Sequence, residues 1–365
     1  MTVREKLRKA IDGKGTTHIS IKKHRSKFVL VFGILLTFLM IIASICIGPT
    51  KILNPLEGLS AALSAISKGG NDLSNNEFLI YHTRLPRTMT ALAVGMGLSV
   101  AGAVYQAIIR NPMVDPYIMG VSSGAGTAAI AVLAFQFTFF GLFSLTSPYT
   151  TAMVAIIGGM IAYAMTMILA ERAGGSTNSY VLSGVIVGLI FGAIQTILMV
   201  FAGNHLSNVM LWLFGSFSSV TWDKVWIILI SSTAICLFTL KWAKELNLIL
   251  LGEQQAKQMG LDAHRFSMFM LTLASVLTSI CVAFCGIIGF VGLIIPHLCR
   301  MLFGGDYRLV LSGSIFFGIG LMIAADILAR MAMIGYELPV GAITTIIGVP
   351  VFAYLLIKKG KMYNG

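Results

Sequence analysis

Long apolar segments separated by short polar stretches recur along the whole chain. Their lengths fall within the roughly 17–25 residues that a membrane-spanning helix needs. A further apolar piece, residues 209–217, is too short to cross about 30 Å of hydrocarbon, and we expect it to form a half-helix at the outer surface. The ten predicted spans are residues 28–47, 85–109, 118–135, 149–170, 180–202, 225–242, 266–285, 287–303, 309–333 and 340–357.

The one long polar interruption in the second half of the chain is residues 241–265. Gly252 and Gly260 bracket a run of good helix formers, residues 253–259. Within this run Glu253 and Lys257 stand four residues apart in the favourable order. Glycine commonly ends a helix, so the pattern predicts one short exposed helix with glycine at each end. A solvated linker is the simpler interpretation, and a handle for a soluble partner is the alternative.

Composition supports an all-α polytopic membrane protein. The 365 residues are 57% hydrophobic and 11% charged, against about 25% charged in an ordinary soluble domain. The net charge of +12 does not indicate a nucleic-acid partner, because the cations fall between the apolar segments, where membrane topology explains them. The five cysteines lie in apolar runs, so we interpret them as packing residues rather than ligands or disulfides.

The distribution of Lys and Arg predicts the orientation. The N-terminal arm is strongly basic, and the apolar run after it is too long for a signal peptide, so we expect an uncleaved first span with the arm inside. The chain then divides into a cytoplasmic arm (1–27), a membrane domain (28–357) with a cytoplasmic loop (241–265), and a cytoplasmic tail (358–365). Ten spans leave only six of the 26 Lys and Arg outside, namely Lys51, Lys68, Arg84, Arg87, Lys224 and Arg330.

Glycines recur every fourth residue in the segment 180–202. Gly184, Gly188 and Gly192 therefore form one smooth stripe on a helix. Close helix packing explains such a stripe. The alternative is that the stripe lines a pathway shared with a second subunit, where no polar side chain would bind and retain the cargo.

No pattern in the chain predicts catalysis. We find no nucleophile constellation, phosphate-binding loop or dinucleotide fingerprint, and we expect no bound cofactor. His297 and Cys299 are two residues apart and point to different faces of a helix, so we expect no metal site there.

Two groups of polar residues are candidates for function. Arg84 and Arg87 flank Pro86 at the predicted outer start of a span, and Arg330 follows Asp326 by one helical turn. An internal ion pair explains Arg330, and the alternative is a positive cluster that docks an acidic protein or an anionic cargo. At the predicted inner face, the small residues Ser176, Thr177 and Asn178 form either a plain turn or a hinged gate.

Seven motifs in the same order resemble those of the FecCD-type permease family. They cover nearly the whole chain from residue 84 onward, and together they are far more specific than any one alone. The motifs are RLPR (84–87), NPMVDPYIMGVSSGAG (111–126), WLFGSF (212–217), LGEQQAKQMGL (251–261), GFVGLIIPHLCR (289–300), ADILAR (325–330) and ELPVGAITTIIGVPVF (337–352).

The resemblance implies the membrane subunit of an ATP-driven importer for iron–siderophore complexes, haem or vitamin B12. It implies ten helices per subunit, two permease subunits around a central pathway, two cytoplasmic ATPases that bind ATP and Mg²⁺, and an extracytoplasmic binding protein. Carried over by position, it assigns Arg84, Arg87 and Arg330 to binding-protein docking, Thr177 and Asn178, with Ser176, to the inner gate, and Gly252, Glu253, Ala256, Lys257, Gly260 and Leu261 to ATPase coupling. A smooth, weakly binding pathway wall, as such an importer needs, agrees with the pathway interpretation of Gly184, Gly188 and Gly192.

Two rival functions fit the composition without the motifs. An ion-driven secondary transporter would use an acid within the membrane, for which Asp326 is the candidate. A structural membrane scaffold would accumulate no cargo at all. The sequence therefore predicts a multi-pass protein of the plasma (inner) membrane, with transport as its function.

Overall fold

The structure is a computed structural model that describes residues 27–135, 148–333 and 336–363. Within these ranges the protein is helical, and its single β feature is an isolated bridge between Met333 and Tyr336. The predicted basic arm, apart from Lys27, lies outside the described residues. The helices are the N-terminal helix (Lys27–Cys46), α2 (Pro55–Ser67), α3 (Asn75–Leu79), η1 (Ile80–Arg84), α4 (Leu85–Ile108), η2 (Pro116–Met119), α5 (Val121–Phe135), α6 (Pro148–Arg172), α7 (Thr177–Val200), η3 (Gly203–His205), α8 (Leu206–Leu213), α9 (Trp222–Lys241), α10 (Ala243–Leu251), α11 (Glu253–Gln258), α12 (Ala263–Cys285), α13 (Val291–Phe303), α14 (Tyr307–Met331) and α15 (Val340–Tyr363).

Each of the ten predicted spans falls on one of these helices. Seven described helices are long and apolar enough to cross a membrane, so the chain is a multi-pass membrane protein. The other three, α5, α13 and the apolar part of α15, have 10–17 residues. At 1.5 Å per residue such helices reach at most about 25 Å, short of the hydrocarbon thickness. Ten crossings per subunit therefore stays a prediction.

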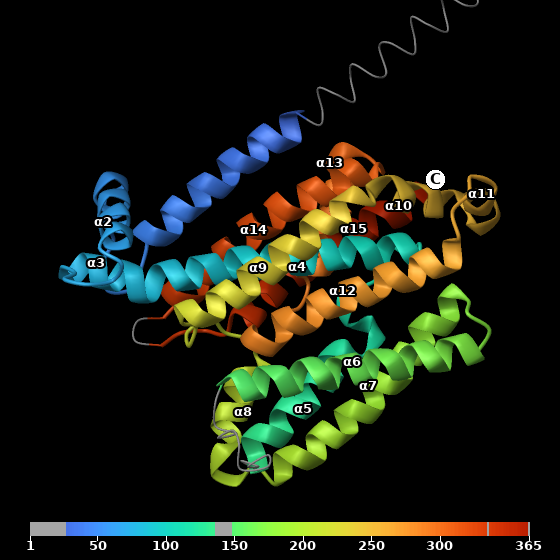
Figure 1. The fold of residues 1–365 in the computed structure, drawn as a ribbon, viewed down its shortest axis with the longest axis horizontal. Coiled ribbons are helices and arrows are strands. Elements are labelled where there is room, and N and C mark those ends of the chain that lie inside the picture. The colour runs from blue at the N-terminus through green and yellow to red at the C-terminus, as the bar shows by residue number, and fades with distance from the viewer. Residues whose placement is uncertain (1–26, 136–147, 334–335, 364–365) are drawn as a thin grey trace, which may run out of the picture.

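The two ends of the bundle differ in what they present. Figure 1 shows α11, the α6–α7 turn and the C-terminus at one end, with α2 and α3 at the other. Lys241, Lys257 and Arg265 lie at the α11 end. By the positive-inside rule we interpret the α11 end as cytoplasmic and call it the inner end; the end with α2 and α3 is the outer end.

Helix α4 is the central element of the bundle. It packs on α9, α12, α13 and α14, which run beside it in Figure 1, and most of its residues are buried. Glycines permit this closeness. A Cβ on Gly95 would lie 2.4 Å from the Gly318 carbonyl oxygen, and one on Gly102 would lie 1.9 Å from that of Gly292. The contacts show the close backbone approach that small residues allow between membrane helices.

Helix α13 begins later than predicted, and its first turn needs a partner from outside. Gly286 and Phe290 have positive φ values of 73° and 68°, so residues 286–290 are not helical and the predicted span 287–303 starts only at Val291. Pro296 has no N–H and cannot bond the Gly292 carbonyl. The Gln106 amide of α4 takes its place.

The Gln106 side chain is buried and contacts three backbone carbonyls. Its Nε2 lies 3.2 Å from Gly292 O, 3.1 Å from Leu293 O and 3.1 Å from Val114 O. Its Oε1 accepts a hydrogen bond from the Arg300 guanidinium. One amide therefore joins α4, the loop before η2 and the proline-containing α13.

Two predictions about local structure need correction. The segment 241–265 is not one loop with a single short helix, because Ala243–Leu251 forms a further helix, α10, that packs on α4 and α14. The short apolar piece predicted at 209–217 is a helix at Leu206–Leu213 instead. It ends there because Gly215 turns the chain with a φ of 70° and the Ser216 amide bonds to the Cys285 carbonyl, 2.9 Å away.

Gln106→Leu keeps the volume but removes every hydrogen bond of this amide, so we expect a lower thermal unfolding midpoint for the purified protein in detergent. Each buried polar group left without a partner costs about 1–3 kcal/mol. In the double variant Gln106→Leu/Pro296→Ala the new N–H can bond the Gly292 carbonyl, and part of the loss should return. Strict additivity of the two changes, or a Gln106→Leu variant as stable as wild type, would contradict this account.

Candidate functional site

The short helix α11 is presented at the inner end much as the sequence predicted. It spans Glu253–Gln258, one residue shorter than the predicted run, and is bracketed by Gly252 and Gly260, whose φ values are 117° and 85°. The Leu261 amide bonds back to the Ala256 carbonyl at 3.0 Å. Ala256 is fully buried and anchors the helix, whereas Glu253 and Lys257 are exposed. The prediction of a short exposed helix with a glycine at each end is confirmed.

Firmly held helices flank α11 on both sides. On one side, α10 buries Ala243, Leu246 and Ile249. Its Asn247 bonds Asp306 Oδ1 and the Tyr307 amide, both at 2.9 Å, and so holds the start of α14. On the other side, Asp262 caps α12 through the Arg265 amide at 3.1 Å. The three-residue spacing of Leu246 and Ile249 was the sequence signal for α10 that we missed.

The three predicted gate residues form the start of α7. Ser176 caps this helix, with its Oγ accepting from the Ser179 amide at 3.1 Å, and Thr177 and Asn178 are the first two helical residues. Before them, Gly174 and Gly175 adopt φ values of 96° and 64°, which glycine tolerates at little cost. The turn therefore combines a capped, exposed helix start with a two-glycine hinge.

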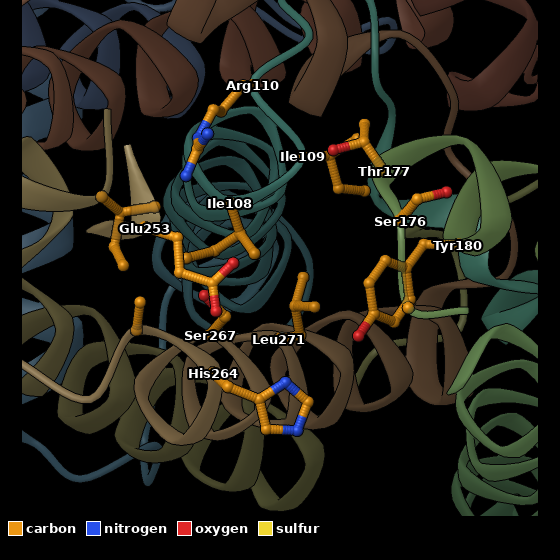
Figure 2. Close-up of a pocket in the computed structure, with 13 residues that line it drawn as sticks. Ile108, Ile109, Arg110, Ser176, Thr177, Tyr180, Glu253, His264, Ser267 and Leu271 are labelled. Atoms are coloured by element: carbon orange, nitrogen blue, oxygen red, sulfur yellow. The ribbon is translucent and has the colours of Figure 1, made fainter. Parts of the chain in front are cut away.

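A cavity of about 250 Å³ lies between α11 and residues 174–178, the turn and helix start that hold the predicted gate residues and that we call the gate turn. Figure 2 shows Glu253 and Ser267 on one side of it and Ser176, Thr177 and Tyr180 on the other, with Arg110 reaching in from the end of α4. The structure thus brings the predicted coupling segment and the predicted gate to one space. The full lining is Ile108, Ile109, Arg110, Gly175, Ser176, Thr177, Tyr180, Ile249, Glu253, Ala263, His264, Ser267 and Leu271.

Arg110 is a cavity residue that the sequence analysis did not single out. It follows α4 with a φ of 51°, a left-handed conformation that glycine would normally supply. Its side chain is exposed, and Figure 2 shows it pointing toward Glu253. The signal available was its position, as the one cation between α4 and the NPMVDP motif.

The outer arginines Arg87 and Arg330 are buried, not exposed as a positive cluster requires. Arg87 Nε donates to Asp326 Oδ1 at 2.7 Å and its Nη1 to Glu337 Oε1 at 2.7 Å. Arg330 Nε lies 3.4 Å from Asp326 Oδ2, so the internal ion pair is confirmed. Arg330 Nη2 also donates to Ser44 Oγ at 2.7 Å. Asp326 is 0% exposed and Arg87 4%, whereas Glu337 is 40% exposed.

Arg84 has a different set of partners from Arg87. Its guanidinium donates to the carbonyls of Ile45 at 2.5 Å, Cys46 at 3.1 Å and Lys51 at 2.6 Å. These are carbonyls at and beyond the end of the N-terminal helix, which lack helical partners. Arg84 therefore holds the first span to the bundle. Arg84 is buried like Arg87 but bonds different groups, so the two do not form an exposed positive cluster, and a docking role for the three arginines stays a prediction.

The three glycines of α7 have different surroundings. A Cβ on Gly184 would lie 1.8 Å from the Ile118 carbonyl oxygen, so Gly184 allows close packing within the chain. Gly188 has ordinary contacts, and a Cβ on Gly192 would meet open space. Packing explains the first glycine of the stripe, and the pathway interpretation remains for the last.

No group of three or more potential metal ligands occurs among the described residues. His297 and Cys299 lie on α13 within its inner half, and Cys299 is buried beside Gly313. All five cysteines are buried and form no disulfide.

Comparisons with known proteins match nearly the whole chain. The profile of the FecCD transport family matches residues 35–358. A protein of Methanocaldococcus jannaschii that bears the name of an ABC transporter permease is 34% identical over 344 residues, 92% of this chain and 97% of the relative. The vitamin B12 import system permease BtuC of Escherichia coli is 33% identical over 318 residues, 87% of this chain and 95% of the relative. A solved structure described as an inward-facing metal-chelate type ABC transporter has a TM-score of 0.77 at 29% identity and covers 90% of this chain and 99% of its own.

Asp326→Asn removes one charge from the buried network and keeps the oxygen that accepts from Arg87. We expect this variant to lose about 3–5 kcal/mol of stability, because it leaves two buried guanidinium groups short of a counter-charge. The thermal midpoint in detergent measures the loss. Glu337→Gln is the control, and it should cost no more than about 1 kcal/mol since Glu337 is partly in solvent. Equal losses in the two variants would show that burial does not decide the effect.

Proposed function

Because the chain belongs to the FecCD transport family, we propose that it carries an iron–siderophore complex across the plasma membrane, with haem or cobalamin as the alternative cargo. The chain is a permease subunit of an ABC importer and a multi-pass membrane protein. The metal-chelate class is supported by the likeness to a metal-chelate type transporter and to a vitamin B12 permease, since vitamin B12 is itself a cobalt complex. Selection within that class belongs to the binding protein that delivers the cargo.

The observation that carries the mechanism is the shared cavity between α11 and the gate turn. A cytoplasmic ATPase that seats on Gly252, Glu253, Ala256, Lys257, Gly260 and Leu261 would push α11 toward the cavity, which has room for that movement. Across the cavity stands the start of α7, hinged at Gly174 and Gly175. Displacement of α11 then changes the position of Ser176, Thr177 and Asn178, and the inner mouth opens or closes.

A second permease subunit is implied by the family and fits the exposed side of α7. This helix is buried on one narrow face and exposes Leu182, Ile186, Leu189 and Ile197. Gly192, which faces open space, leaves a smooth strip beside them. We place the pathway along this strip, between two subunits, because weak and uniform contacts let a bulky cargo leave as readily as it enters.

Docking of the extracytoplasmic binding protein must accommodate the burial of the arginines. Arg87 is the arginine whose partner reaches solvent, because Glu337 is 40% exposed. Its Nη2 atom has no hydrogen-bond partner among the described residues. A carboxylate of the binding protein would therefore reach Arg87 at the edge where Glu337 now pairs with it, while Arg84 and Arg330 hold the surrounding helices in place.

The ion-driven alternative depends on Asp326, but this residue forms ion pairs with two arginines of the same chain. Its two oxygens face Arg87 and Arg330, and the side chain is fully buried. A proton relay needs an acid that takes up and releases its proton during transport. Both carboxylate oxygens of Asp326 are already paired with arginines of the same chain, which favours a structural role.

The coupling role of α11 predicts that its loss uncouples the ATPase without unfolding the permease. Deletion of residues 253–255 combined with Lys257→Glu should abolish co-purification of the ATPase and reduce cargo uptake to background, while the thermal midpoint of the permease is retained. The control is Arg265→Glu, which changes an exposed charge at the same end, on the next helix. Undiminished uptake after the α11 change would refute the proposal.

The energy source and the cargo are tested together in proteoliposomes that contain the full importer. We expect uptake of a ferric siderophore that requires ATP on the side of the vesicle membrane that the ATPases face. This uptake should be unaffected when the proton gradient is collapsed. Uptake driven by the gradient without ATP would overturn the importer mechanism. ATP-driven uptake of haem or cobalamin, with none of a ferric siderophore, would keep the mechanism and correct the cargo.

A further inference from the structure

Helix α2 has an apolar face that nothing in the described chain covers. Its small residues Gly58, Ala62 and Ala65 are buried against the bundle. Leu56, Leu63 and Ile66 are 82%, 61% and 54% exposed, and they recur at helical spacing. A third sector, with Glu57, Ser60 and Ser67, is exposed and polar. One face of the helix is thus packed, one is apolar and exposed, and one is polar and exposed.

The packed face fixes the depth of α2 relative to the first span. Ala62 belongs to one small core with Ile45, and Ile41 and Ala61 pack against it. Ile41 lies five residues before the end of the N-terminal helix, about 7.5 Å at the helical rise. A Cβ on Gly58 would come within 2.6 Å of Cys46 Sγ at that helix end. Helix α2 therefore packs against the last turn of a membrane-spanning helix.

Its orientation agrees with this depth. Figure 1 shows α2 standing across the long axis of the bundle, beside the outer end of the N-terminal helix. We take the bundle axis as the membrane normal, which places α2 along the membrane plane. Amphipathic helices in this position bury their apolar face at the boundary between headgroups and acyl chains.

Aromatic side chains mark the same level. Trp222 packs on the core that contains Ala62. It stacks on Trp226 with ring centroids 6.0 Å apart and lies 5.4 Å from the Tyr81 ring. Its Nε1 donates to the Tyr81 carbonyl at 2.9 Å. Tryptophan and tyrosine gather at the membrane–water interface, because one end of each side chain is apolar and the other polar.

The helix is held rigidly enough to serve as an anchor. Glu77 of α3 accepts from Ser64, from Lys68 Nζ at 2.8 Å and from the Ser74 amide at 2.7 Å. Lys51, which precedes α2 in the chain, bonds Asn76 Oδ1 of α3 at 3.3 Å. The chain therefore has a lysine shortly before and directly after α2, and lysines near a membrane surface attract anionic phosphates.

We propose that α2 is an interfacial anchor whose Leu56, Leu63 and Ile66 side chains insert into the outer leaflet, with the polar sector turned to water. The partner is lipid rather than a docked protein, because α2 packs against the end of a spanning helix and next to a group of interfacial aromatic side chains. The anchor fixes the outer end of the first span, and so the level of the Arg84 contacts, relative to the bilayer.

Spin labels on single cysteines test the proposal in the full-length protein reconstituted into phosphatidylcholine–phosphatidylglycerol vesicles. The five native cysteines are buried, so introduced ones dominate the labelling. Leu63→Cys and Glu57→Cys are matched, since six residues place them about 120° apart on one helix. We expect the label at position 63 to collide severalfold more with oxygen than with a water-soluble nickel chelate, and the label at position 57 to show the reverse.

Three results would overturn the proposal. The first is equal access of the nickel chelate to both labels, which means that α2 stands in water. The second is a label at position 63 that becomes shielded only when an extracytoplasmic binding protein is added, which assigns the face to protein docking. The third is a normal oxygen preference at position 63 that persists in Leu56→Gln/Ile66→Gln, because the inserted row then does not hold the helix in place.

Discussion

The structure depends on one constraint: the hydrocarbon interior of a membrane offers no hydrogen-bond partners, so backbone polar groups there must be satisfied within the protein and buried charges must be paired. Gln106 bonds the Gly292 carbonyl that Pro296 leaves free, and it also contacts the Leu293 carbonyl. Arg84 bonds the carbonyls at the end of the N-terminal helix. Arg87 and Arg330 share Asp326. These polar contacts join helices far apart in the sequence, and each involves α4, the turn before it, or α14 packed on it.

This arrangement makes α4 a fixed axis between the two ends of the molecule. Its outer end carries Arg87, and Arg110 follows its inner end at the cavity beside α11. Glycines along α4 allow its backbone to pack directly against the backbones of α13 and α14. The parts suited to movement lie around this axis: α11, attached through Ala256 between two glycines, and the two-glycine turn before α7. The proposed mechanism needs both rigid and mobile parts, because the displacement of a coupling helix is transmitted to other segments only if the helices beside it stay rigid.

Family membership and structure contribute different parts of the functional argument. The family implies the partners: ATPases, a binding protein and a second permease. The structure shows the places at which we propose that they act. At the inner end that is a cavity bounded by α11 and the start of α7. At the outer end it is a buried charge network whose one solvent-exposed member is Glu337, so an arriving acid has to compete with a carboxylate that is already present.

The sequence by itself determined the apolar segments that form the long helices and the short helix between Gly252 and Gly260, and it predicts an inner position for the basic loops by the positive-inside rule. Hydrophobic length, charge and glycine act locally, so these features can be read residue by residue. Only the tertiary structure decided that the outer arginines are buried, that Gln106 serves α13, that Ala243–Leu251 is a packed helix, and that Arg110 faces the cavity beside Glu253. Each of these depends on which residue of a distant helix lies opposite, and pairings across 100 or more positions, such as Arg87 with Asp326, follow from the packing of whole helices rather than from any local pattern.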